Sequence, residues 1–183
     1  MNTSLLSDRL WPQSGLLRNV MLAVLGSLFV TAAAQVPVPM YPVPMTLQTL
    51  AVLMVGAAYG ARLGGATLAL YALEGSVGLP VWPGFDSGVM WPSYGYILGF
   101  VAAAFVVGLL AERGWDRSPL RMFAAMLVGN VVLYIPGLIW LAAWVGADKT
   151  LEYGLTPFIL GDLLKAAVAA LGFPAVWALL DRR

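Results

Sequence analysis

The chain has 183 residues, of which 61% are hydrophobic and only 10% are charged, whereas a soluble globular domain carries roughly 25% charged residues. Its net charge of +1 provides no basic field for nucleic acid. The absence of cysteine and histidine excludes thiol nucleophiles, imidazole bases and the usual zinc ligands. The sequence therefore predicts one all-α integral membrane domain, residues 1–183, with no metal, no cofactor and no nucleic-acid partner.

Hydrophobic stretches alternate along the chain with short polar or Pro/Gly-rich breaks. The first apolar run is too long for a signal-peptide core, so we expect a retained helix from Leu16 onward. The six expected helices cover residues 16–34, 46–59, 66–78, 93–110, 122–145 and 158–180. The second and third are shorter than the ~20 residues that span a bilayer, so we expect them to be tilted, re-entrant or longer than these limits.

Two long segments between the expected helices are rich in proline and glycine. Residues 35–45 contain four prolines, and residues 79–92 contain Pro80, Pro83 and Gly84. Proline cannot continue a helix, so both segments are predicted to be irregular. Long irregular segments in a compact protein are usually functional or disordered. Their Val, Met, Tyr and Trp content favours packing over an amphipathic ligand.

The distribution of basic residues predicts the orientation. If six helices cross the membrane, the N-terminus, the turn after the second helix, the loop after the fourth and the C-terminus share one side, which holds Arg9, Arg18, Arg62, Arg113, Arg117, Arg121, Arg182 and Arg183. The other side has only Lys149. Under the positive-inside rule both termini are then cytoplasmic in a plasma (inner) membrane, and the two irregular segments face outward.

Ionisable residues inside the expected spans are costly and need a reason. Asp162 and Lys165 lie three residues apart, so they project from one helix face. They form either a ligand site or an ion pair that only anchors the helix end. Glu74, just before the second outer segment, is either a ligand contact or an interfacial group. Interhelical hydrogen bonding adequately explains either Gln48 or Asn130, and Asn130 in particular is expected to be structural.

Small and aromatic residues also recur in patterns. Glycines every four residues, at Gly56, Gly60 and Gly64, predict close helix packing. The similar series Ala23, Ser27 and Thr31 fits internal packing or docking onto another membrane subunit. Four aromatic residues surround the second outer segment and predict interfacial anchors or an aromatic-lined pocket, namely Trp82, Trp91, Tyr94 and Tyr96.

Several sequence blocks occur in the order and spacing of a known transporter family. They are Val36–Pro39 with Val43–Val52, Gly78–Val81, Tyr96–Phe100 and Gly161–Lys165. From its first expected helix to its last, the chain resembles BioY, the biotin-binding S component of energy-coupling-factor transporters. It departs at Trp91–Tyr96, where many family members read Gly-Pro-Thr-Gly-Gly-Tyr, so no ligand contact is carried over to Trp91 or Tyr94.

The resemblance implies a six-helix S-component-like bundle with a biotin pocket near the outer surface, lidded by the loop between the first two helices. It also implies a transmembrane coupling subunit with paired ABC-type ATPases, although some family members act without them. The expected substrate-binding residues are Asp162, Lys165, Gln48, Tyr96, Ser93, Asp86, Gly84 and Glu74.

The chemistry of biotin fits these residues. Its ureido ring offers two N–H donors and one carbonyl acceptor, so Asp162 can accept from it and Lys165 can meet either the ureido oxygen or the carboxylate. An enzyme is not expected, because the spans offer no second convincing catalytic group besides Asp162. The alternative is a self-sufficient secondary transporter or channel for another small organic anion or vitamin. Such a protein would show paired repeats, and we find none between residues 1–88 and 89–183.

The six-helix topology gives a direct prediction. Reporter fusions after residue 15, within residues 111–121 and at the C-terminus should all report the cytoplasmic side, because the arginines lie there. An outer-side signal from any one of the three fusions would overturn the even helix count.

Overall fold

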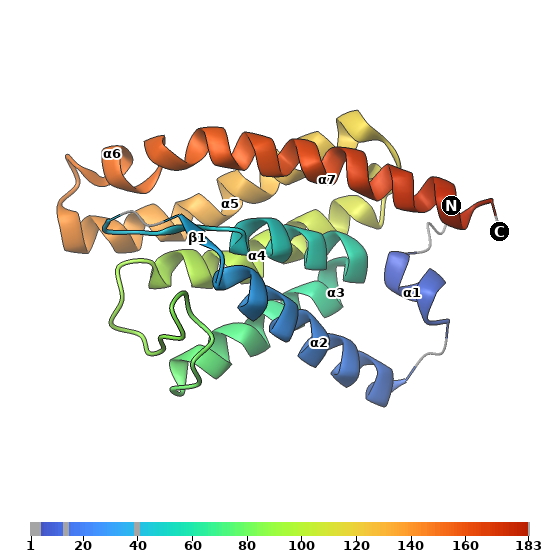
Figure 1. Ribbon diagram of the computed structural model, residues 1–183, viewed down its shortest axis with the longest axis horizontal. Coiled ribbons are helices and arrows are strands. Elements are labelled where there is room, and N and C mark those ends of the chain that lie inside the picture. Colours follow the sequence, from blue (N-terminus) through green and yellow to red (C-terminus); the bar gives the residue numbers. More distant parts are fainter. Residues whose placement is uncertain (1–4, 13–14, 39–40, 183) are drawn as a thin grey trace.

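The computed structural model describes residues 5–12, 15–38 and 41–182, and most of them are helical (Figure 1). The elements in chain order are α1 (Leu6–Leu10), α2 (Leu16–Ala34), β1 (Pro37–Val38), β2 (Met45–Thr46), α3 (Gln48–Ser76), α4 (Tyr94–Ala111), η1 (Trp115–Arg117), α5 (Pro119–Val145), α6 (Thr150–Gly154), η2 (Thr156–Phe158) and α7 (Ile159–Leu180). Within the described ranges, five helical stretches are long and apolar enough to cross a membrane.

One of these five, α3, is bent back on itself at Gly60. The φ of 80° and ψ of 179° at Gly60 are non-helical, and a positive φ is readily adopted only by glycine. A Cβ placed on Gly64 would lie 2.9 Å from the Cα of Gly56, although residues eight apart on a straight helix are about 12 Å apart. The arms before and after Gly60 therefore lie against each other, and the bundle has the six long helical arms that the sequence predicted.

The turn between these two arms is shorter than predicted. The second arm begins directly after Gly60 instead of at Ala66. The first backbone N–H groups of a helix have no partner within the helix, and here a nearby carboxylate provides one. The backbone N–H of Ala61 donates to Oε1 of Glu112, 2.8 Å away at the end of α4. A carboxylate at a helix N-terminus also interacts favourably with the helix dipole.

Other limits shift by only a few residues. Helix α5 begins at Pro119 instead of Met122, since proline is favoured in the first turn of a helix. The segment of residues 35–45, predicted to be irregular, contains a minimal antiparallel pair in which Pro37 faces Thr46. The predicted linker, residues 146–157, contains the short helix α6 and most of the short helix η2.

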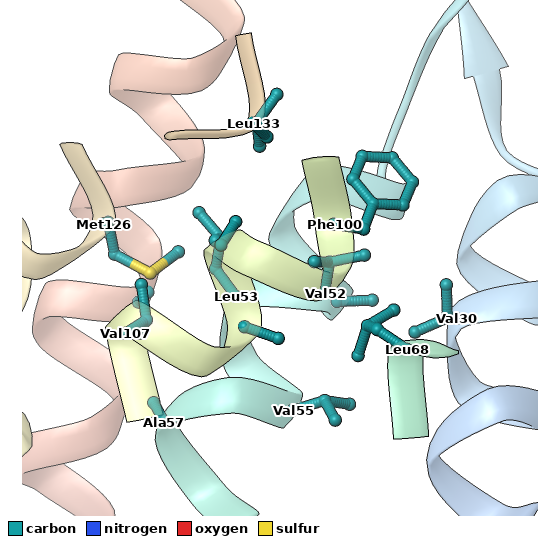
Figure 2. Close-up of a cluster of buried hydrophobic side chains, with 14 of the residues drawn as sticks. Val30, Val52, Leu53, Val55, Ala57, Leu68, Phe100, Val107, Met126 and Leu133 are labelled. Carbon is teal, nitrogen blue, oxygen red and sulfur yellow. The ribbon is translucent and has the colours of Figure 1, made fainter. Parts of the chain in front are cut away.

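Helix α4 lies between α3 and α5, and the helices approach closely because small residues line their contacts. A Cβ on Gly56 would lie 2.8 Å from the Cα of Ala104, so only glycine fits there. Larger apolar side chains form the buried core (Figure 2), among them Val52, Leu53, Leu68, Phe100, Val107 and Met126. Leucine and valine side chains are also exposed along α2 and α7, as expected of surfaces that face lipid.

Helix α2 contacts the second arm of α3 at Ser27, a member of the small-residue series that the sequence singled out. The buried Ser27 hydroxyl donates to the carboxylate of Glu74, and the Thr31 hydroxyl donates to the carbonyl of Ser27. Ser27 therefore serves internal packing. Glu74 is half-buried beside α2, so its carboxylate is explained as a helix–helix contact.

The first and last helices meet at one end of the bundle. Arg9 of α1 lies 3.9 Å from Asp181, directly after α7. At the same end the indole N–H of Trp177 donates to Asp116 at 2.6 Å, while burial raises the pKa of that carboxyl group. The β1–β2 pair, the segment of residues 79–92 and α6 gather at the opposite end, called here the loop end (Figure 1). A chain whose first helix begins and whose last helix ends at the same end of the bundle crosses it an even number of times.

Close packing predicts opposite outcomes for two glycine substitutions. In Gly108→Ala, the new Cβ would lie 2.6 Å from the Cα of Ala61, so we expect a loss of about 1–3 kcal/mol of stability from overpacking. Gly172→Ala in α7 is the matched control, because among the described residues no heavy atom outside its own helix backbone and its chain neighbours lies within 4 Å of the Cβ position.

We expect Gly172→Ala to be neutral or to stabilise by up to ~1 kcal/mol, since alanine favours helix more than glycine does. Thermal unfolding of both variants in the same detergent measures the difference. Equal melting temperatures would contradict the close contact between Gly108 and Ala61.

Candidate functional site

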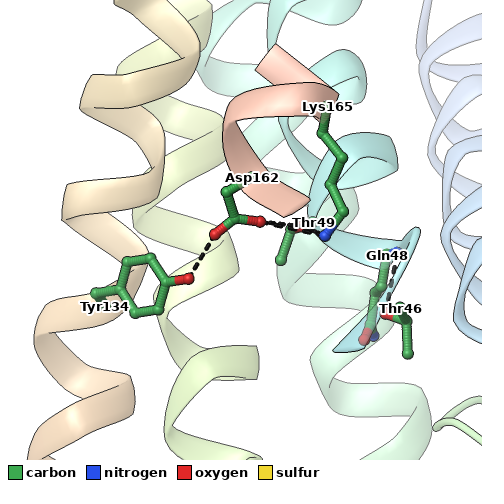
Figure 3. A network of polar contacts seen from close by, with 6 residues as sticks. All are labelled: Thr46, Gln48, Thr49, Tyr134, Asp162 and Lys165. Atoms are coloured by element: carbon green, nitrogen blue, oxygen red, sulfur yellow. Dashed lines mark hydrogen bonds and ion pairs between the residues drawn. The ribbon is translucent and has the colours of Figure 1, made fainter. Parts of the chain in front are cut away.

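A buried ion pair lies near the loop end of α7 (Figure 3). The Nζ of Lys165 is 3.1 Å from Oδ1 of Asp162 and 2.9 Å from Oγ1 of Thr49 in α3. The side chains of Asp162 and Lys165 are only 7% and 11% exposed. Their spacing of three residues puts them on one helix face, as predicted, and that face is turned into the bundle.

A third helix contributes to the same cluster. The hydroxyl of Tyr134 in α5 donates a hydrogen bond to Oδ2 of Asp162 (Figure 3). Both carboxylate oxygens therefore have partners, as a buried charge requires. Residues from α3, α5 and α7 hold the Asp162 carboxylate in place. Oδ1 accepts from both Lys165 and Thr49, whereas Oδ2 accepts from Tyr134 and keeps a lone pair that can accept a further donor.

The cluster borders a cavity near the loop end, with a volume of about 50 Å³. Its lining combines apolar walls with a few polar groups and consists of Val43, Pro44, Thr46, Gln48, Thr49, Pro83, Ser93, Tyr96, Ile97, Phe100, Leu133, Tyr134, Phe158 and Lys165. This mixture is typical of sites for small organic ligands, but such sites usually measure about 300–1,000 Å³. A ligand of biotin size therefore requires at least one wall to move.

The polar groups around the cavity are held in fixed orientations. The backbone N–H of Gln48, at the start of α3, donates to Oγ1 of Thr46, and its side-chain Nε2 donates to the Tyr71 hydroxyl at 2.6 Å. The Tyr96 hydroxyl donates to the carbonyl of Gly154, so Tyr96 lines the cavity with its aromatic ring. Lys165 is the one charged side chain among the described lining residues.

The structure brings together five of the eight predicted site residues. Gln48, Ser93, Tyr96 and Lys165 line the cavity, and Asp162 is bonded to three of the lining residues.

The other three predicted site residues lie elsewhere. Glu74 accepts from Ser27 of α2, the N–H of Gly84 donates to Gln35, and Asp86 is exposed. These three residues do not line the cavity that the structure contains, where Pro83 is the one lining residue from 79–92.

Of the four aromatic residues singled out around the second outer segment, Tyr96 alone lines the cavity. Trp82 is fully buried beneath the segment of residues 79–92. Tyr94 stacks edge-on against Trp140, with ring centroids 5.5 Å apart, and the indole N–H of Trp140 donates to the carbonyl of Trp91. These aromatic side chains anchor the loop end and do not line the cavity.

Sequence reasoning missed Thr49 and Tyr134. Thr49 directly follows Gln48, which was predicted, but a threonine in an apolar helix is common. Tyr134 follows the buried Asn130 by four residues, so the two share one face of α5. That polar stripe was a usable signal. What it could not reveal is that the stripe faces Asp162.

The sequence profile of the BioY family matches residues 2–182. The chain belongs to the BioY family. It is 36% identical over 168 residues to the biotin transporter BioY of Rhizobium etli, covering 84% of this chain and 90% of the relative. It is 34% identical over 159 residues to the biotin transporter BioY of Thermotoga maritima, covering 85% and 93%.

A solved structure agrees on the fold of this BioY-family chain. The crystal structure of the S component for biotin from an ECF-type ABC transporter superposes with a TM-score of 0.75 at 22% sequence identity. The match covers 88% of this chain and 92% of that structure. The six-helix S-component-like bundle predicted from the sequence is therefore confirmed, as is a multi-pass membrane protein.

The burial of Asp162 and Lys165 predicts a particular stability pattern. Asp162→Asn or Lys165→Met alone should destabilise the protein by about 3–5 kcal/mol if the pair is fully desolvated, because the remaining charge loses its partner. The double variant should recover much of this loss. Thermal unfolding of the three variants in detergent measures the coupling. Strictly additive losses would show that the pair is solvated.

Proposed function

We propose that this chain is the membrane subunit that captures biotin for uptake. The observation that carries the proposal is the buried Asp162–Lys165 pair, which borders an apolar cavity near the loop end of a BioY-family bundle. Curated relatives that match most of the chain are named biotin transporters. The role is binding for transport and not catalysis.

The recognition chemistry follows from the groups around the cavity. Asp162 accepts a ureido N–H through a lone pair left free by its present partners, and Lys165 donates to the ureido oxygen or to the carboxylate. The apolar bicycle and tail pack against Pro44, Pro83 and Phe100. In a low-dielectric pocket these charge-assisted hydrogen bonds are stronger than they would be in water.

Binding then includes a movement of the segment that covers the cavity. Val43, Pro44 and Thr46 line it from the stretch between α2 and α3, whose regular structure is the two-residue pair β1–β2. Few hydrogen bonds hold such a pair, so it is the wall of lowest opening cost. We propose that this stretch opens to admit biotin and then closes over it.

The proposed setting is the cell's inner, or plasma, membrane, with both termini cytoplasmic and the loop end outside. Support comes from the arginines near α1, η1 and the end of α7, which the positive-inside rule assigns to the cytoplasm. The proposed partners are a transmembrane coupling subunit and ABC-type ATPases. The sequence contains no phosphate-binding glycine loop ending in Lys-Ser or Lys-Thr, so a partner would hydrolyse the ATP.

A vitamin panel tests the proposal. Biotin should raise the unfolding temperature of the detergent-solubilised chain, because a ligand at 100 times its Kd adds about 2.7 kcal/mol to the folded state. Thiamine and riboflavin should leave it unchanged, since neither combines a ureido ring with a carboxylate, the pattern matched to Asp162 and Lys165. The same panel on Asp162→Asn is the control, and its biotin shift should be smaller. Equal shifts with all three vitamins would contradict the assignment to biotin.

A further inference from the structure

A single glutamine ties α2 to the second loop-end segment. Gln35 directly follows α2, and its Nε2 donates to the carbonyls of Trp82 at 2.9 Å and Thr31 at 3.3 Å. Its Oε1 accepts from the N–H groups of Gly84 at 3.0 Å and Phe85 at 3.2 Å. One side-chain amide thus joins the end of α2 to both sides of Pro83.

These partners fix the orientation of the amide. The two carbonyl oxygens require a donor, and the two N–H groups require an acceptor, so a flipped amide would oppose all four. Glutamate has nearly the same shape as glutamine, but one of its oxygens would face two carbonyls. Methionine preserves the length and offers neither a donor nor a strong acceptor.

The same segment is anchored from beneath by Trp82. This side chain is fully buried, and its indole N–H donates to the carbonyl of Gly88 at 2.9 Å. Its ring lies edge-on to Tyr71 at 5.2 Å and against Gly75, where a Cβ would overlap it. Trp82 therefore fixes the depth of the segment, while Gln35 fixes its position relative to α2.

This anchoring matters because Pro83 is a wall of the cavity. On its other side, the Tyr71 hydroxyl donates to the carbonyl of Val81 and accepts from Gln48, a second lining residue. The wall is thus held by α2 through Gln35 and by α3 through Tyr71. Gln35 itself does not line the cavity.

We propose that Gln35 is a positioning residue that sets the Pro83 wall of the binding cavity from outside it. Its effect on ligand affinity rests on the proposed function, whereas its effect on the wall does not. If the wall is in place in only one molecule in ten, the apparent Kd rises about tenfold. Through Gln35, any displacement of α2 also displaces the cavity wall.

Residue-resolved amide hydrogen exchange on the full chain in detergent, without ligand, tests the first step. Gly84 is the cleanest reporter, because the N–H of Phe85 also donates to the carbonyl of Trp82. In Gln35→Met the Gly84 amide should exchange at least ~10-fold faster than in the parent. Ser27→Ala is the matched control, since it removes a bond between α2 and α3 without touching residues 82–88.

Biotin affinity tests the second step. We expect Gln35→Met to raise Kd about 5- to 10-fold, while Ser27→Ala keeps the parent's Kd even if its melting temperature falls. Should Gln35→Met fail to fold, Gln35→Glu replaces it, with the same expected direction in both measurements.

The outcomes separate the two proposals. Unchanged exchange at Gly84, or parent-like biotin affinity with fast exchange, overturns the role of Gln35. An equal rise in Kd for Ser27→Ala also overturns it, because any weakening of α2 packing would then suffice. A parent that binds no biotin contradicts the proposed function, and the exchange measurement still decides whether Gln35 holds the wall.

Discussion

The buried pair of Asp162 and Lys165 is the interaction on which the arrangement of the site depends. Two charges removed from water are costly unless each is paired and hydrogen-bonded. Thr49 and Tyr134 meet this requirement from two other helices. The demand for partners therefore sets the register of α3 and α5 against α7, and the small cavity forms where these helices converge near the loop end.

The same requirement governs the irregular backbone near the loop end. Non-helical segments at membrane depth persist only where their polar groups find partners within the protein or line a cavity. Gln35, Tyr71 and the indole of Trp82 supply such partners to residues 81–88. The described residues of the stretch between α2 and α3 have fewer such bonds, which is why we propose that this wall of the cavity moves while the other stays fixed.

Close helix approach completes the arrangement. At Gly56 and Gly108 the facing backbones leave no space for a Cβ. Because glycine has none, α4 can pack directly against both arms of α3. The break at Gly60 ends the first arm of α3 at one end of the bundle. At the other end of this arm, its first residue, Gln48, lines the cavity. Helix α2 stands outside this compact unit and reaches the site through Gln35.

The sequence alone determined the membrane class, the six helices, the two irregular segments and the face shared by Asp162 and Lys165, because composition and spacing along one helix are local properties. Only the tertiary structure decided that Tyr134 and Thr49 hold Asp162 and that Glu74 serves α2 instead of the cavity. Whether a polar side chain faces a ligand or a neighbouring helix depends on how helices rotate and cross. That choice is set by packing between residues distant in sequence, which periodicity along a single helix does not encode.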